Sequence, residues 1–282
     1  MIIYKTIEDI GRHLKKFKEG KNVIGFVPTM GALHDGHISL IRKCNEEADI
    51  AVCSIFINPT QFNNPDDLKK YPVTIEKDIY LLEQNDCDVL FLPDIEQVYP
   101  KGLDGEGEHF DLGYLETILE GKYRPGHFQG VCRVVKRLLE IIKADKMYLG
   151  QKDYQQCMVL KKLIELIGSD VELVICPTMR ETDGLAMSSR NLRLNGEDRK
   201  LALEIYKNLE LIKKEVVIGN VKYLTEKTSF RLTEKGFKVD YVELAEADTL
   251  KAVSEWDGKT KLVALIAAFI NDVRLIDNMV LN

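Results

Sequence analysis

The sequence contains no hydrophobic run long enough to cross a membrane and no segment with the features of a secretion signal. Its longest apolar stretch, Leu262–Ile270, is far short of the roughly 20 residues that a membrane helix needs. Residues 1–20 lack the continuous apolar centre of a signal peptide. We therefore expect a cytoplasmic protein that does not associate with a membrane.

The six cysteines stand far apart, and none forms a CxxC pair. Most of them fall in apolar strand or helix patterns, which is typical of reduced thiols packed in a core. This spacing argues against a disulfide framework and against a zinc site. Cys132 and Cys157 lie closest to the motifs described below, and we expect both to be structural.

The charge balance excludes a general binder of polyanions. The 282 residues include 45 Asp and Glu against 39 Lys and Arg, which gives a formal net charge of -6. Lysines are scattered among acids rather than gathered in a stripe, so we expect no nucleic-acid partner. The length suits one large domain or two domains of unequal size.

From residue 20 to about residue 177, short apolar runs alternate with helical patterns. Apolar strands that are buried on both faces and separated by helices predict a parallel doubly wound sheet. Pro28 is expected to end the first strand. The predicted strands are 23–27, 50–57, 88–92, 147–149 and 171–176, with helices that begin near 36 and span 128–142 and 154–167.

The pattern changes after Arg190. Two amphipathic helices, 195–214 and 221–235, precede three strands at 239–245, 262–270 and 273–276. Helices followed by adjacent strands are typical of a small α+β domain. We therefore expect an α/β fold: a Rossmann-like doubly wound parallel sheet over residues 1–177 and a smaller C-terminal α+β domain over 178–282. A cleft between them would suit a ligand.

The segment from Pro93 to His127 is rich in Gly, Pro and acids, with one short helix predicted at 114–119. Its acidic residues and a histidine allow a metal site at Asp104, Glu106, Glu108 and His109. A solvated loop is the favoured interpretation, because acidic Gly-rich segments rarely order by themselves. No protein ligand to a metal is predicted.

His34-Asp35-Gly36-His37 follows the first predicted strand and opens a helix. Gly36 allows a tight entry into the helix, where free backbone N–H groups favour an anion. Two imidazoles at such a place can donate hydrogen bonds to polyphosphate oxygens. The alternative is a loop with two incidental histidines, which we disfavour because the chain has only five. Neither a Walker loop nor a dinucleotide fingerprint is present.

Two later segments carry cations. Lys152 lies in Gly-Gln-Lys-Asp at the end of a predicted strand, and Arg190 follows Ser188 and Ser189. A lysine and an arginine could hold phosphates, the serines could add neutral donors, and Asp153 could accept from ribose hydroxyls. Each segment alone could be a solvated turn. Their order on an α/β chain after the HxGH motif favours a nucleotide site.

This combination resembles the nucleotidyl-transfer superfamily, which shares HxGH and a KMSKS-like loop. Within it, five segments resemble the pantoate–β-alanine ligase (pantothenate synthetase) family over essentially the whole chain. They are PTMGALHDGH (28–37), FINPTQF (56–62), RPGHFQGV (124–131), GQKDYQQ (150–156) and DGLAMSSRN (183–191).

The resemblance implies catalytic roles for His34, His37, Lys152 and Arg190, and pantoate or β-alanine contacts for Gln61 and Gln156. Asn58, Arg124 and His127 are weaker candidates that would line or shape the pocket. The implied ATP contacts are Met30, Gly31, Ala32, Leu33, His34, Asp35, Gly36, His37, Gly150, Gln151, Lys152, Asp153, Met179, Met187, Ser188, Ser189 and Arg190.

The implied reaction condenses (R)-pantoate with β-alanine through a pantoyl adenylate and yields pantothenate, AMP and diphosphate, a step of coenzyme A biosynthesis. ATP is a substrate, and Mg²⁺ is expected to be held mainly by its phosphates. The C-terminal domain and the Ser-Ser-Arg loop are expected to close over the adenylate, with a hinge near Pro177. A homodimer is expected, in which an edge strand such as 50–57 could pair across the two-fold axis.

Two positions depart from the family pattern: Val73 stands where Arg is common, and Gln151 where Glu is common. An Arg contact at position 73 is therefore not assumed. Two other functions remain open from the residues. A nucleotidyltransferase with a phosphate acceptor would need a second cationic pocket. A nucleotide-binding regulator without turnover would release no AMP. An aminoacyl-tRNA synthetase is disfavoured by the length and the net acidity.

Overall fold

The computed structural model describes residues 1–103 and 108–282. Contacts divide these residues into two compact units, which are described separately below. The first unit comprises residues 1–150 and 159–177, and the second comprises residues 151–158 and 178–282. The domains expected at 1–177 and 178–282 stay a prediction. Residues 151–158 group with residues 178–282 in the second unit.

The first unit contains a sheet of six parallel strands in the order β1-β4-β3-β2-β5-β6. The chain adds β3 and β4 on one side of β2 and then returns to place β5 on the other side. The carboxyl ends of β2 and β5 therefore flank the point where the strand order reverses, which is where such sheets bind ligands. The strands are β1 (Ile2–Tyr4), β2 (Ile24–Thr29), β3 (Ile50–Ile55), β4 (Val89–Phe91), β5 (Lys146–Gly150) and β6 (Glu172–Cys176).

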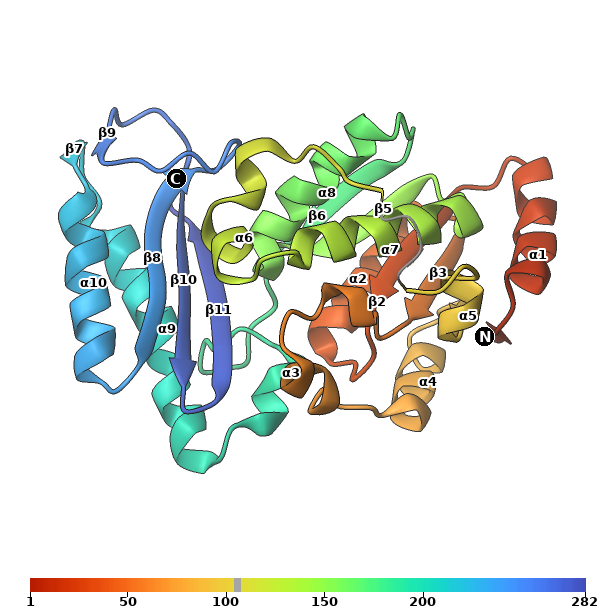
Figure 1. Cartoon of the computed structure of the whole chain (residues 1–282), viewed down its shortest axis with the longest axis horizontal. Helices are drawn as coiled ribbons and strands as arrows, with labels where there is room; N and C mark the ends of the chain where they lie inside the picture. Colours follow the sequence, from red (N-terminus) through yellow and green to blue (C-terminus); the bar gives the residue numbers. More distant parts are fainter. Residues whose placement is uncertain (104–107) are drawn as a thin grey trace. The chain divides into compact units, whose positions relative to one another are not determined.

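Helices cover both faces of this sheet. On one face α2 (Asp35–Glu47) and α4 (Ile75–Glu83) pack over a cluster that includes Ile41, Cys53 and Leu90. Strand residues that point to the other face of the sheet, such as Phe26 and Val52, are buried as well. Figure 1 shows α7 (His127–Ile142) in front of the strands. The predicted doubly wound parallel sheet is confirmed.

The other helices of this region are short or peripheral. Helix α1 (Ile7–Glu19), which packs against α7, and strand β1 were not among the predicted elements. The segment that was expected to be a long loop with one helix holds several short helices. The remaining elements are η1 (Pro59–Gln61), α3 (Pro65–Lys69), α5 (Ile95–Val98), η2 (Gly113–Glu116), α6 (Leu119–Tyr123), η3 (Gln151–Asp153) and α8 (Tyr154–Leu166).

Two expectations about the strands are wrong. Strand β3 pairs with β2 on one side and with β4 on the other, so it is not an edge and cannot pair across a two-fold axis. Pro28 does not end β2, which continues to Thr29. Pairing of β2 with β5 involves Gly25 and Phe26, so Pro28 lies beyond the part of β2 that this ladder uses.

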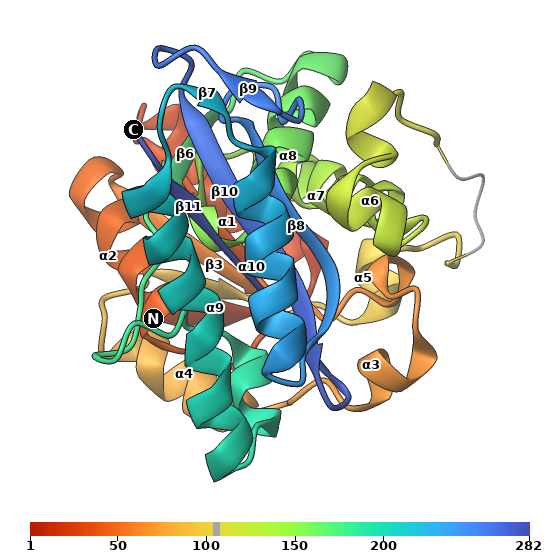
Figure 2. The ribbon, with the colours of Figure 1, turned by 90° about the vertical axis from the view of Figure 1, so that its left-hand side faces the viewer.

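The second unit is an α+β structure, as expected. Figure 2 shows α9 (Gly196–Glu215) and α10 (Lys222–Glu234) side by side in front of an antiparallel sheet in the order β11-β10-β8. The sheet is formed by β8 (Lys238–Glu246), β10 (Leu262–Ile270) and β11 (Val273–Val280). A small pair, β7 (Gly219–Asn220) and β9 (Glu255–Trp256), and the turn η4 (Ser189–Arg193) complete the unit.

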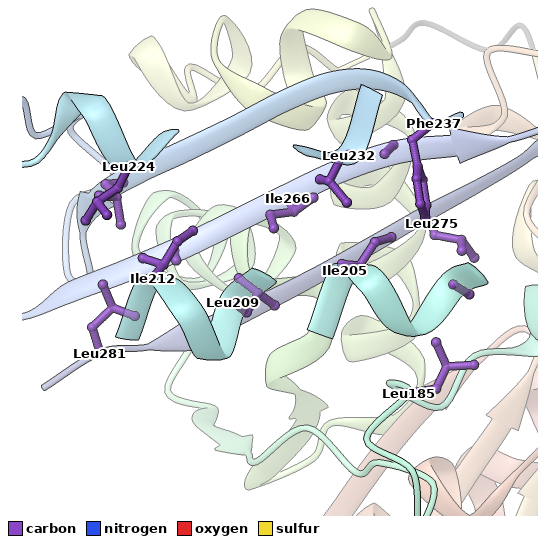
Figure 3. Packing of buried hydrophobic residues seen from close by; sticks show 14 of the residues in the cluster. Leu185, Ile205, Leu209, Ile212, Leu224, Leu232, Phe237, Ile266, Leu275 and Leu281 are labelled. Atoms are coloured by element: carbon purple, nitrogen blue, oxygen red, sulfur yellow. The ribbon is translucent and has the colours of Figure 1, made fainter. Parts of the chain in front are cut away.

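The core of the second unit lies between its helices and its sheet. Ile205, Leu209 and Ile212 point from α9 toward Ile266 of β10 and Leu275 of β11 (Figure 3). These three α9 residues recur at intervals of three and four, which places them on one face of the helix. The amphipathic pattern thus fixes which face of α9 is buried.

All six cysteines are buried and none of them forms a disulfide, which confirms the expectation of packed thiols. Burial raises the pKa of Cys44, Cys87 and Cys132 to about 12. Of the candidate metal ligands in the acidic loop, Asp104 and Glu106 lie outside the described residues. Within residues 1–103 and 108–282, no group of three His, Cys, Asp or Glu could hold a metal ion, and no helix could span a membrane.

Candidate active site

The loop between β2 and α2 is held by one buried carboxylate. Asp78 of α4 is fully buried and accepts hydrogen bonds from the backbone N–H groups of Ala32 at 2.9 Å and Leu33 at 2.8 Å. The hydroxyl of Thr74, one helical turn earlier, donates to the same carboxylate at 2.9 Å. Three donors offset the cost of burying this charge. Asp78 therefore sets the position of the loop that leads to His34.

The backbone of this loop takes an unusual path that Asp78 supports. Gly31 and Ala32 have φ angles of 82° and 50°, so two consecutive residues are left-handed. A Cβ atom at position 31 would lie 3.1 Å from a carboxylate oxygen of Asp78 and 3.1 Å from a methyl group of Ile55. Glycine is thus favoured by the left-handed conformation, and a side chain would in addition be tightly packed. Ala32 holds a strained conformation with its N–H bound to Asp78.

His34 and His37 cap α2 reciprocally. His34 is the N-cap residue, and its Nδ1 accepts from the backbone N–H of Gly36 at 3.2 Å. His37 lies in the first turn, and its Nδ1 accepts from the backbone N–H of His34 at 3.3 Å. The two ring centroids are 4.0 Å apart. A neutral imidazole whose Nδ1 accepts carries its proton on Nε2. Both rings therefore offer an Nε2–H donor at the positive end of a helix.

Gln61 belongs to a buried polar network around Asn58. The Nδ2 of Asn58 donates to Gln61 Oε1 and to the backbone carbonyl of Gly130, both at 3.1 Å. Gln61 Nε2 lies 2.8 Å from the sulfur of Met30. A Cβ atom on Gly130 would lie 2.2 Å from the carbonyl oxygen of Thr60, so α7 packs directly on the turn that carries Gln61. The predicted pantoate residue and the predicted ATP loop thus meet.

Tyr99 completes the network around Asn58. Its hydroxyl donates to Asn58 Oδ1 at 2.9 Å, and Thr60 donates to the same oxygen from its hydroxyl at 2.9 Å and its N–H at 3.3 Å. Burial raises the pKa of Tyr99, which keeps this hydroxyl protonated as a donor. Asn58 therefore organises the turn that presents Gln61.

His127 uses its ring nitrogens in the opposite sense to His34 and His37. Its Nδ1 lies 2.7 Å from the backbone carbonyl of Gln61, and its Nε2 lies 3.1 Å from NH1 of Arg124. A carbonyl oxygen only accepts and a guanidinium only donates, so the neutral ring carries its proton on Nδ1. Arg124 is also 3.6 Å from the buried carboxylate of Glu120. His127 thus supports the backbone of Gln61.

In the second unit, the Lys152 segment is attached to β11. The side chain of Asn278 donates to the backbone carbonyls of Gln151 at 3.0 Å and Lys152 at 2.8 Å. Lys152 Nζ lies 3.6 Å from Asp153 Oδ1. Tyr154 Oη donates to the carbonyl of Ala247 at 2.9 Å, and burial raises the pKa of Tyr154 to about 12. The start of α8 is therefore fixed to the C-terminal sheet.

Ser188, Ser189 and Arg190 follow a short antiparallel turn. The backbone N–H of Met187 donates to the carbonyl of Met179 at 3.0 Å, and Arg180 forms a β-bridge with Ala186. Ser188 then caps η4 by accepting from the backbone N–H of Arg190 at 3.3 Å. Ser189 is buried. The Met179–Met187 turn therefore delivers the Ser-Ser-Arg sequence at the start of a 3-10 helix.

The predicted site residues thus form two sets. In the first unit, the Met30–His37 loop and Gln61 lie together, with Asn58, Arg124 and His127 around Gln61. In the second unit, Lys152 and Asp153 lie in η3, which packs against β11, and Gln156 is half-buried on α8. The Met179–Arg190 segment leads into η4, which also contacts β11. The proximity of the sets to one triphosphate stays a prediction.

Two residues that hold these motifs were missed by the sequence interpretation. Asp78 is an acid on the buried face of an amphipathic helix, between Ile75 and Leu82, and such a break in an apolar face is a usable signal. Asn278 lies in a strand near the C-terminus and carries no local signal, since its partner Gln151 is 127 residues away.

Comparisons with known proteins agree on one family. The family model for pantoate–beta-alanine ligase matches residues 2–280. A pantothenate synthetase of Cytophaga hutchinsonii is 44% identical over 100% of this chain and 99% of that protein. Another from Fervidobacterium nodosum is 42% identical over 100% of both chains. The chain therefore belongs to the pantoate–beta-alanine ligase family.

Solved structures of the family have the same fold. A pantothenate synthetase from Thermus thermophilus superposes with a TM-score of 0.90 at 36% identity and covers 99% of both chains. A pantoate–beta-alanine ligase from Francisella tularensis, determined with β-γ ATP and β-alanine, gives a TM-score of 0.83 at 39% identity over 99% of this chain and 97% of that one.

Proposed function

We propose that the chain condenses (R)-pantoate with β-alanine through a pantoyl-adenylate intermediate and releases pantothenate, AMP and diphosphate. It is an enzyme of the pantoate–β-alanine ligase family, with ATP as a substrate. The observation that carries the proposed route is the pair of imidazoles at the start of α2, whose Nδ1 atoms both accept from backbone N–H groups. In a neutral ring this places the proton on Nε2 as a donor. Such donors suit phosphate oxygens that gain charge when diphosphate leaves.

In the first step, a carboxylate oxygen of pantoate attacks the α-phosphorus of ATP. No protein nucleophile is needed, because the substrate supplies one, so placement and charge stabilisation provide the catalysis. We assign His34 and His37 to the phosphates, with His37 as the proton donor from Nε2. Lys152 and Arg190 would hold the α-phosphate and the departing diphosphate, with Ser188 and Ser189 as neutral donors.

We assign Gln61 and Gln156 to pantoate, because an amide can both donate to a carboxylate and accept from a hydroxyl. Asn58, Tyr99 and His127 would hold Gln61 in place. The assigned adenosine contacts are Gly150, Asp153 and the backbone of Met179. In the second step, the amine of β-alanine attacks the activated carbonyl carbon, and AMP leaves.

We propose that Mg²⁺ is held mainly by the nucleotide, because this ion commonly binds through substrate phosphates and water. When bound there, it would neutralise phosphate charge. The protein's own contribution would be the donors and cations named above.

The domain arrangement completes the proposal. Residues 1–177 would bind nucleotide and pantoate, and residues 178–282 would form a lid that shields the adenylate from water, hinged near Pro177. We also propose a cytoplasmic homodimer, with no membrane or nucleic-acid partner. The resemblance to the family supports the dimer, whose mass in solution tests it. Because β3 is internal, pairing through this strand is not part of the proposal.

The proposed route is tested with purified protein, ATP, Mg²⁺, D-pantoate and β-alanine. AMP release should require both pantoate and β-alanine. Omission of β-alanine should leave trapped pantoyl adenylate and at most one turnover of diphosphate. Diphosphate without AMP in the complete mixture would instead indicate a nucleotidyltransferase, and ATP binding without any product would indicate a regulator.

A further inference from the structure

A buried polar cluster joins β11 to both cation-bearing segments of the second unit. It consists of Arg180, Asp277 and Asn278, which we call the β11 cluster. Asp277 and Asn278 are 5% and 2% exposed. Buried polar groups are costly unless they are hydrogen-bonded, and here the bonds lead to the segments that carry Lys152 and Arg190.

Asn278 holds two successive peptide groups, whose carbonyls belong to Gln151 and Lys152. Its Nδ2 donates to the carbonyls of Gln151 and Lys152 at 3.0 and 2.8 Å, and its Oδ1 accepts from Gln151 Nε2 at 3.2 Å. Two carbonyl oxygens require the amino group to face them, so the orientation of the amide is determined by its partners. The side chain touches the motif and leaves Lys152 Nζ for other contacts.

Arg180 attaches the second segment to the same strand. Its guanidinium binds Asp277 through two parallel bonds of 2.7 and 2.9 Å, and it donates to the carbonyls of Asn278 at 3.2 Å and Gly184 at 3.1 Å. It also lies over the ring of Tyr206, at 4.6 Å from the centroid. These contacts hold both the start and the tip of the turn that leads to Ser188.

We propose that Asn278 and Arg180 are positioning residues for adenylate formation. By holding both segments on β11, they keep Lys152 and Arg190 at a fixed spacing, so the two cations belong to one body. Cations that are held in place before the reaction lower the barrier to adenylate formation, because the protein need not rearrange to bring them to the phosphates. The inference rests on the proposed function, because it assumes that Lys152 and Arg190 act on the triphosphate.

The departure from the family pattern at Gln151 fits this cluster. Asn278 Oδ1 must face position 151, because its amino group is taken by the two carbonyls. A glutamine amide supplies the donor that this oxygen needs. A glutamate would place a second acceptor 3.2 Å away, so the usual family residue conflicts with Asn278 in this chain.

The main test is Asn278→Asp, which preserves shape but replaces the two donors with a carboxylate that faces two carbonyls. Asn208→Asp is the matched control, because Asn208 is also buried in the second unit and donates within its own helix, to the carbonyl of Glu204 at 2.9 Å. We expect kcat for adenylate formation to fall at least tenfold in Asn278→Asp, with a smaller change in the KM for ATP. The control should change kcat less than twofold at a similar loss in Tm.

Gln151→Glu provides a test at a position that is less buried, where folding is not at risk. It should lower kcat at least threefold, and Gln151→Met, which removes the charge, should lower it less. In an Asn278→Ala background the added cost of Gln151→Glu should disappear. Equal effects of Gln151→Glu in both backgrounds would overturn the proposal.

Arg180→Lys should lower kcat as well, because one ammonium cannot reproduce the paired bonds to Asp277. If the wild type is active and Asn278→Asp lowers kcat no more than Asn208→Asp does, the positioning role is refuted and the proposed function is not. A wild type that releases no AMP from the full mixture would refute the proposed function, whatever the variants do.

Discussion

The loop that carries His34 and the segment that carries Lys152 are held by opposite kinds of side chain. In the first unit, Asp78 accepts from two backbone N–H groups. In the second unit, Asn278 donates to two backbone carbonyls. In both cases the bonds go to the main chain of the segment that is held.

The difference follows from which backbone groups each segment turns inward. The loop before α2 turns the N–H groups of Ala32 and Leu33 toward Asp78; they need an acceptor, and a carboxylate is a strong one. A segment leaving a strand through a 3-10 turn presents carbonyls, which need a donor. An asparagine amide supplies that donor without a charge. Each segment is thus held by a side chain whose acceptor or donor atoms match the backbone groups that the segment presents.

The largest expected effects test whether the His34–His37 segment and the Lys152 segment contribute equally to catalysis. His37→Gln and Lys152→Met should each lower kcat by about 10²–10³-fold, which corresponds to about 2.7–4 kcal/mol for one lost transition-state donor. Rapid-quench measurement of AMP formation reports this loss directly.

His13→Gln and Lys162→Met serve as controls. The ring of His13 on α1 contacts the rings of Tyr4 and Phe17, and Lys162 pairs with Glu165 on the surface. Both should keep wild-type kcat. Full turnover in His37→Gln or Lys152→Met would remove that residue from the assigned site.

A smaller effect is expected when the carboxylate anchor loses its charge. Asp78→Asn should reduce the free energy of unfolding by about 1–3 kcal/mol, because an amide cannot accept from all three donors. It should also lower kcat about tenfold, since the loop before His34 loses its support. Urea unfolding and steady-state kinetics measure the two changes.

Asp88→Asn is the matched control for this change. Asp88 also accepts from a backbone N–H, that of Ala51 at 2.8 Å, but it is remote from the loop. It should lose stability and keep kcat. If Asp78→Asn retained wild-type kcat at the same loss of stability, the carboxylate would support the fold and not the site.

The smallest effect concerns Glu243, a half-buried carboxylate that lacks the triple support of Asp78. Burial raises the pKa of Glu243 on β8, and a bond from the backbone of Leu244 opposes this only in part. The folded state therefore holds the proton more tightly than the unfolded chain does. The associated stability is present below the unfolded pKa and is lost as the pH rises through the folded pKa.

Glu243→Gln should accordingly raise Tm by a few degrees at pH 7, and the gain should vanish near pH 4. Thermal unfolding across this range measures it. Glu226→Gln on α10, where the side chain is 68% exposed, controls for the loss of one negative charge. A gain for Glu243→Gln that persisted at low pH would contradict the role of the raised pKa.

Local patterns in the sequence determined most of the elements and both sets of motifs. Apolar runs predicted five of the six strands of the parallel sheet, all except β1, and intervals of three and four predicted the buried face of α9. Both patterns depend only on neighbouring residues. The HxGH segment also contains its own cap, since His34 and His37 bond to backbone groups within the same motif.

The tertiary structure decided what the local patterns could not specify. The order of strands made β3 internal, because the pairing of parallel strands depends on crossovers and not on the strand's own residues. The anchors were decided in the same way: Asp78 acts on a loop more than forty residues earlier, and Asn278 acts on a segment 127 residues away. Hydrogen bonds to a main chain leave no signature in the sequence of the segment that they hold, so only the fold shows which residue supplies them.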